Sequence, residues 1–278
     1  MNKENRSSTL LEKTKINKKY IKNSEYILDK LRKAKKTKLE NIQNCKQMIM
    51  RLPRKVVFLY SNPTVSEKFF QQTNLSKLNA LSREMRYVIS LLNPFDFIMQ
   101  PATTFVNFKE ILQKFKPEII VWSGHTLENQ LIFESESGKI SPETVNAQEC
   151  VEILKNTYID LPNRLKVFVL MGCNTDKIGD TICQELNVHV ICWSTVTEDN
   201  AAAAFTSGII HYIRNIFDRN LNIDADIMFA EGLNAFKSGI DPNSKQNFQI
   251  GNPIEQLQQG VEIPNLHGIP LHIKPSPS

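Results

Sequence analysis

The sequence predicts an α/β protein with a mostly parallel sheet, helices on both faces of that sheet, and a basic helical arm in front of it. Short, continuous apolar runs rich in Val, Ile and Phe recur along the chain, for example VVFLY at 56–60 and VFVL at 167–170. Segments with apolar residues at helical spacing, such as Leu81, Met85 and Val88, separate these runs. Continuous apolar strands that alternate with helices are typical of parallel sheets covered on both faces.

Each predicted element follows from its local pattern. Strands are expected where apolar, β-branched residues form short runs: 55–60, 95–100, 119–122, 166–170, 188–193 and 269–273. Helices are expected where apolar residues repeat every three or four positions: 75–92, 106–116, 141–156, 176–186, 200–217 and 224–238. Residues 130–134 and 139–140, on either side of Ser137 and Gly138, predict a small hairpin after the third strand.

The first part of the chain differs from the rest in charge. Residues 1–55 contain 17 Lys and Arg but 5 Asp and Glu, a net charge of +12, whereas the remaining residues carry a net charge of −7. We therefore expect a basic, partly helical or disordered arm over residues 1–52 and a folded domain over residues 53–278. The arm fits a solvated extension, a contact with an anionic surface such as nucleic acid or lipid headgroups, or a partner helix. Nothing in the arm reads bases, so nucleic-acid specificity is not expected.

Composition and motifs exclude several classes of protein. The content of 41% hydrophobic and 23% charged residues is that of a globular chain, not of a disordered or collagen-like one. No apolar run reaches the ~20 residues of a membrane helix, and the polar N-terminus lacks the apolar centre of a signal peptide. The expected location is the cytoplasm, with the nucleus as the alternative. The five cysteines form no C-x-x-C pair and indicate reduced thiols without a metal site. G-x-G-x-x-G and P-loop patterns are absent, so no cofactor is expected.

Two candidate catalytic residues follow successive apolar strands. The strand at 119–122 is followed by Ser-Gly-His, so His125 lies just beyond its end. The strand at 166–170 is followed by Met-Gly-Cys, so Cys173 lies just beyond the end of that strand. In an open α/β sheet, reactive groups gather at the carboxyl ends of the strands. A thiolate attacks a peptide carbonyl well, and a nearby imidazole both favours the thiolate and protonates the leaving amine. The alternative is a small buried cysteine and an unrelated polar histidine.

The order of these motifs resembles that of the CHAT-type caspase-like cysteine peptidases, in the clan of caspases, metacaspases and separases. The resemblance covers roughly residues 55–273, through VVFLYSNP (56–63), KPEIIVWSGH (116–125), LIFESESGKISPE (131–143), LKVFVLMGCN (165–174), VHVICWSTVTEDNAAAAF (188–205) and HGIPLHI (267–273). The family's L-x-x-L-x-x-E-x-R helix is matched by Leu78, Leu81, Glu84 and Arg86. The 48 residues that separate His125 from Cys173 are also close to the caspase-type spacing of roughly 50. The resemblance implies a caspase-like fold and a Cys173–His125 dyad.

The resemblance also implies an oxyanion hole made of backbone N–H groups at Gly124, Thr126 and Cys173. Two positions depart from the family pattern, because Thr126 stands where the family usually has glycine and Gly172 where it often has alanine. The Cβ atom of Thr126 restricts the backbone and could obstruct a substrate.

A pair of acidic residues, Glu198 and Asp199, lies where the family has carboxylates near its substrate pocket. The alternative is that these residues cap the helix that follows them. The loop at 193–200 contains no Lys or Arg, so a pocket walled by it would favour a basic side chain before the scissile bond.

The sequence therefore predicts a caspase-like cysteine endopeptidase that cleaves protein or peptide substrates after a basic residue. The alternative is a catalytically inactive caspase-like interaction module, a pseudo-protease, with an activating or regulatory protein partner held through the basic arm. A third interpretation, a nucleic-acid binder with a Rossmann-like body, predicts salt-dependent retention on DNA or RNA.

Overall fold

The computed structural model describes residues 30, 33, 35, 36, 56–63, 78, 80–94, 96–127, 129–136, 142–240, 242 and 268–276. Its contacts divide the chain into two units, Met1–Leu52 and Pro53–Ser278. The strands β1 to β9 all belong to the second unit. The predicted basic arm lies almost wholly outside the described residues.

A six-stranded sheet in the order β2-β1-β3-β7-β8-β9 forms the centre of the second unit. Its strands are β1 (Val56–Ser61), β2 (Phe97–Gln100), β3 (Ile119–Gly124), β7 (Val167–Met171), β8 (His189–Trp193) and β9 (Pro270–Ile273). The strands from β2 to β8 run parallel, and β9 pairs antiparallel with β8. Every residue of β1, β3 and β7 is buried, because their continuous apolar side chains meet helices on both faces.

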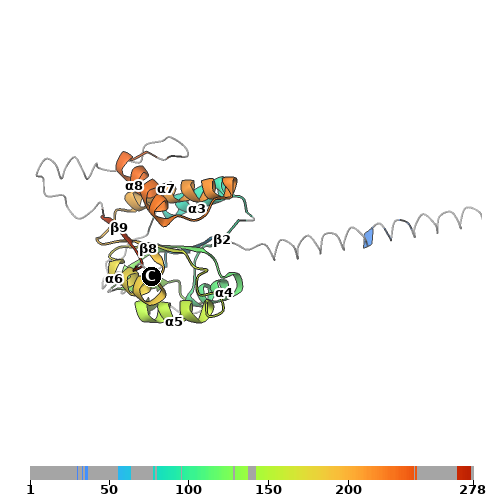
Figure 1. The fold of residues 1–278 in the computed structure, drawn as a ribbon, viewed down its shortest axis with the longest axis horizontal. Helices are drawn as coiled ribbons and strands as arrows, with labels where there is room; N and C mark the ends of the chain where they lie inside the picture. The colour runs from blue at the N-terminus through green and yellow to red at the C-terminus, as the bar shows by residue number, and fades with distance from the viewer. Residues whose placement is uncertain are drawn as a thin grey trace, which may run out of the picture. The chain divides into compact units, whose positions relative to one another are not determined.

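Helices form a layer on each face of the sheet (Figure 1). One layer consists of α3 (Leu81–Leu91), α7 (Asp199–Arg219) and α8 (Ala225–Ser238), and the other of α4 (Phe105–Phe115), α5 (Ala147–Thr157) and α6 (Asp176–Leu186). Successive side chains of a strand point to opposite faces, so Phe58 and Tyr60 pack with the first layer and Leu59 with the second. This architecture confirms the predicted fold class.

A small antiparallel sheet follows β3 and corrects one prediction. It contains β4 (Thr126–Leu127), β5 (Gln130–Phe133) and β6 (Glu143–Asn146) in that order. The helix predicted at 141–156 is therefore wrong at its start, since residues 143–146 form β6 and α5 begins at Ala147. The side chain of Asn146 accepts the Glu149 N–H at 2.9 Å while the Glu149 carboxylate accepts the Asn146 N–H at 2.9 Å, and this capping box ends the strand and starts the helix. Residues 139–140, the second half of the predicted hairpin, lie outside the described residues.

Candidate active site

The pairing of β3 with β7 brings the two predicted catalytic residues to the same edge of the sheet. Ser123 of β3 lies opposite Met171 of β7, and His125 and Cys173 each follow two residues later. Both residues line one cavity of ≈ 30 Å³. The cavity lies on the face that α3 and α7 cover, since Leu81 of α3 and side chains of α7 also line it.

Hydrogen bonds to the end of β8 hold the turn that carries Cys173. The N–H of Asn174 donates to the carbonyl of Thr195 at 3.0 Å, and the N–H of Thr175 donates to the carbonyl of Trp193 at 2.8 Å. The buried hydroxyl of Thr175 accepts the N–H of Trp193 at 3.1 Å. Asn174 has a φ of 51°, a left-handed conformation that asparagine tolerates better than most residues. The turn between β7 and α6 is therefore fixed by hydrogen bonds of the two residues that follow the thiol.

Cys173 differs from the other described cysteines in its exposure. Its side chain is half-buried, whereas Cys150, Cys183 and Cys192 are buried in the core. Burial raises the pKa of Cys150 and of Cys192 to about 12, so those thiols stay protonated. The Thr197 N–H donates to the Sγ atom of Cys173 at 3.4 Å.

The two departures from the family pattern contact each other. A Cβ atom at Gly172 would lie 3.0 Å from Cγ2 of Thr126 and 2.8 Å from the Trp122 ring. The hydroxyl of Thr126 donates to the carbonyl of Cys173. The Thr126 side chain therefore lies against the turn that carries the thiol, and its methyl group occupies space that an alanine at position 172 would need.

The register of β4 and β5 determines which way the Thr126 backbone points. The Ile132 N–H donates to the His125 carbonyl at 3.0 Å, and Thr126 lies opposite Leu131. In an antiparallel ladder this arrangement makes Thr126 and Leu131 a non-hydrogen-bonded pair. The Thr126 N–H is thus directed away from β5. Gly124, the third predicted oxyanion residue, is the last residue of β3, and a Cβ atom there would lie 2.7 Å from the Ser61 carbonyl oxygen of β1.

Of the two predicted acidic residues, one lines the cavity. Asp199 is the first residue of α7, and its Oδ2 atom accepts the Ala80 N–H at 2.7 Å. Glu198 is the N-cap residue of α7 but makes no capping hydrogen bond with its side chain, and it is not among the residues that line the cavity.

A second carboxylate in the cavity, Glu84 of α3, was not predicted from the sequence as a site residue. It is 1% exposed and accepts the Ser123 hydroxyl at 3.0 Å. Burial raises its pKa to about 8, and the negative charge of Asp199 contributes to that rise. The sequence does carry a signal, because Glu84 falls three residues after Leu81 and four before Val88, on the apolar stripe of its helix. An acid on the buried face of a helix is unusual unless it has a partner.

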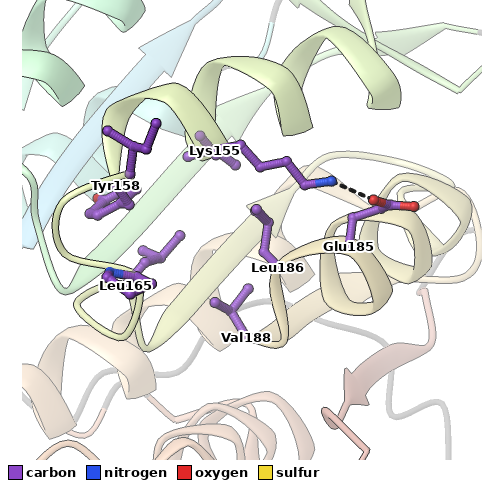
Figure 2. A pocket seen from close by; sticks show the side chains of 9 residues that line it. Lys155, Tyr158, Leu165, Glu185, Leu186 and Val188 are labelled. Carbon is purple, nitrogen blue, oxygen red and sulfur yellow. Dashed lines mark hydrogen bonds and ion pairs between the residues drawn. The ribbon is translucent and has the colours of Figure 1, made fainter.

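A larger cavity of ≈ 200 Å³ lies away from these residues, near the amino ends of β7 and β8. Its lining is mostly apolar and includes Leu165, Leu186 and Val188 (Figure 2). At its rim the ammonium group of Lys155 donates to the Glu185 carboxylate at 2.6 Å, so the two charged groups satisfy each other. Neither Cys173 nor His125 is among the residues that line this cavity.

The described residues include no group of three or more His, Cys, Asp and Glu side chains that could hold a metal ion. Among those same residues, no helix is long and apolar enough to cross a membrane.

Comparisons with known proteins give similarity at the level of structure. No protein-family model and no curated protein matches the chain. Solved structures do match, among them the crystal structure of the Arg-specific cysteine proteinase gingipain R. That structure is 11% identical, with a TM-score of 0.43, over 70% of this chain and 45% of the proteinase chain. The chain thus spans less than half of the length of that proteinase.

Proposed function

We propose that this protein is a caspase-like cysteine endopeptidase, of the CHAT type that its motifs resemble, with Cys173 as nucleophile and His125 as general base. The supporting observation is the pairing of Ser123 with Met171, from which both residues follow at the same edge of the sheet and line one cavity. Cys173 is also partly exposed, whereas the three other described cysteines are buried, and this difference supports the proposal as well.

In the proposed reaction, the imidazole of His125 takes the thiol proton and Sγ of Cys173 attacks the peptide carbonyl carbon. The C–N bond then breaks, and the imidazolium gives its proton to the leaving amine. Water, deprotonated by the same imidazole, hydrolyses the resulting thioester and restores the thiol. The reaction needs no oxidant, reductant or cofactor.

Backbone N–H groups of Thr126 and Cys173 are the proposed donors to the tetrahedral oxyanion. The ladder register supports this role for Thr126, because its N–H points away from β5. The threonine side chain lies against Gly172 and the Cys173 carbonyl, so it also positions the turn that carries the thiol. Gly124 allows the close approach of β1 that this end of the sheet needs.

A basic residue before the scissile bond is the proposed specificity. Asp199 lines the same cavity as the dyad, and the described lining contains no Lys or Arg. Asp199 is half-buried, and a carboxylate in such a place favours a cationic side chain over a neutral or anionic one. Glu198, at the N-cap of α7, remains a candidate for the outer part of this pocket.

One observation favours the alternative, a catalytically inactive interaction module. The cavity of ≈ 30 Å³ holds roughly two water molecules by the usual measure of about 10–15 Å³ each. A substrate side chain is larger, so an active enzyme must widen this cavity when it binds.

The decisive experiment is covalent labelling of the intact protein with electrophilic peptides that end in Arg, Lys or Asp. Mass spectrometry of the digested adduct should locate the label on Cys173, with the Arg or Lys peptide reacting faster than the Asp peptide. The His125→Ala variant should lose this reaction while its unfolding midpoint stays close to that of the wild type. Equal labelling of several cysteines, or labelling that His125→Ala does not change, would reject the dyad. Faster labelling by the Asp peptide than by the Arg and Lys peptides would reject the specificity.

A further inference from the structure

We propose that the larger cavity and the exposed turn beside it form the contact surface of a two-fold symmetric dimer of this chain, in which Ile159 of each copy fills the cavity of the other copy. The surface lies near the amino ends of β7 and β8, away from the candidate active site. The inference goes beyond the proposed function and does not rest on it, because it concerns the association of two copies and not their chemistry.

An exposed isoleucine lies at the rim of the cavity. Ile159 follows α5 and is one of the lining residues, yet its exposure of 79% is the highest among the large apolar side chains of the described residues. Leu161, two residues later, is 43% exposed, and Pro162 is exposed as well. Adjacent exposed apolar side chains within a polar rim are typical of a protein contact surface. A small molecule inside the cavity would leave Ile159 and Leu161 in water, whereas a protein partner would cover them.

Hydrogen bonds hold the turn that carries this isoleucine. The Leu161 N–H donates to the Tyr158 carbonyl at 2.9 Å, and the Arg164 N–H donates to the Leu161 carbonyl at 3.0 Å. The Nε atom of Arg164 also donates to the Lys116 carbonyl at 2.6 Å, which ties the turn to the end of α4. Ile159 is therefore presented by a preformed turn that loses little conformational freedom when a partner binds.

The cavity suits an aliphatic side chain. Its polar groups already have partners, because the Tyr158 hydroxyl donates to the Pro117 carbonyl at 2.7 Å and Lys155 pairs with Glu185 at the rim (Figure 2). Every other residue of the lining is apolar. A cavity of about 150 Å³ lined by Leu, Ile and Phe binds benzene in another protein. The volume of ≈ 200 Å³ here therefore accommodates a branched side chain such as that of isoleucine.

The surface carries both halves of one contact, which is what a two-fold dimer requires. A protruding apolar side chain and a hollow of suitable size lie next to each other, whereas an unrelated partner would need only the hollow. The charges at the rim are also balanced: Lys155 and Glu185 are 48% and 45% exposed, and Lys116 pairs with Asp160 beside the turn. Two-fold symmetry brings Lys155 of one copy to Glu185 of the other, so that opposite charges meet twice.

The test is sedimentation equilibrium of the full chain at about 1–100 μM, a range that covers weak and moderate association. The wild type should form a dimer of twice the chain mass of 31.9 kDa. Ile159→Ser should raise the dissociation constant by about 10- to 100-fold, because symmetry places the lost apolar contact in the dimer twice. The matched control, Ile89→Ser, changes a 58% exposed isoleucine of α3 on the opposite face of the sheet and should leave the dimer unchanged.

Charge reversal gives a second test that does not depend on any single variant. Lys155→Glu and Glu185→Lys should each weaken the dimer, because like charges then face each other across the two-fold axis. An equimolar mixture of these two variants should associate again, since every negative position then meets a positive one. The control variants Arg214→Glu and Asp218→Lys reverse the charges of an exposed ion pair on α7, and each should stay dimeric, alone and mixed.

Each outcome supports or overturns the inference. A monomer at every concentration overturns it, and so does a dimer that neither Ile159→Ser nor the reversals at Lys155 and Glu185 weaken. Recovery of the dimer in the mixture of Lys155→Glu with Glu185→Lys supports it. Urea midpoints check the fold of each variant, and the mixture decides if Ile159→Ser does not fold. A dimer whose Cys173 takes no label refutes the proposed peptidase but not this surface, whereas a monomer whose Cys173 is labelled refutes the surface but not the peptidase.

Discussion

Replacing Gly172 with alanine tests whether Thr126 and Gly172 share one volume beside the thiol. The new Cβ atom would lie 3.0 Å from Cγ2 of Thr126, 3.0 Å from the Gly124 carbonyl oxygen and 2.8 Å from the Trp122 ring. The backbone of Gly172 is not in the left-handed region, so alanine adds no backbone strain there. Any loss of stability must come from crowding.

The size of the effect follows from the contacts. Overpacking of this kind costs about 1–3 kcal/mol of the free energy of unfolding. Thr126→Ser keeps the hydroxyl that donates to the Cys173 carbonyl but removes the crowding methyl, and on its own should cost about 0.8 kcal/mol for the lost apolar contact. In the Thr126→Ser background, Gly172→Ala should cost less by about 0.5–1 kcal/mol, because one of its three close contacts is gone. The contacts with Trp122 and Gly124 remain, so the rescue is partial.

The assay is a double-mutant cycle measured by urea unfolding at constant m-value. The matched control cycle pairs Thr126→Ser with Gly179→Ala, whose Cβ atom would meet Ile273, Cys192 and Val190 instead. That control should be additive within about 0.3–0.5 kcal/mol. Additivity of Thr126→Ser with Gly172→Ala, or a more stable Gly172→Ala protein, would show that the two positions do not share space.

Two further predictions concern other parts of the chain. Removing residues 1–52 should leave the free energy of unfolding of residues 53–278 unchanged within about 0.5 kcal/mol by urea titration, since we propose that the basic arm is a separate part; insoluble protein after this truncation would contradict the domain boundary. The second prediction concerns His189 and His272, whose Nδ1 and Nε2 atoms lie 3.0 Å apart and whose pKa values burial lowers. The unfolded chain therefore binds protons first, and stability should fall as the pH drops from about 7 through the ordinary histidine pKa of about 6.5 to the lower folded values, then level off. His189→Asn should flatten this slope in urea midpoints between pH 5 and 8, and a stability that rises on acidification would contradict the argument.

The local sequence pattern was sufficient to predict the strands and most of the helices. A strand that is buried on both faces has a continuous apolar run, which few other structures produce. It was insufficient at residues 143–146. There the short segment Glu-Thr-Val-Asn has no helical or strand period of its own, and its pairing with β5 decides its conformation. The capping box of Asn146 and Glu149 is a sequence signal for a helix start. It places the start of α5 at Ala147, where the structure has it, instead of at residue 141.

For the candidate site, the sequence by itself determined that His125 and Cys173 end successive apolar strands, since strand ends and glycine turns are local features. Only the tertiary structure decided that β3 and β7 are neighbours in a register that sends both residues into one cavity. It also decided which acids line that cavity, because Glu84 and Asp199 meet only when α3 and α7 pack on the same face of the sheet. Sequence spacing fixes the direction of a side chain within its own element, whereas contacts between elements far apart in the chain depend on how the layers pack.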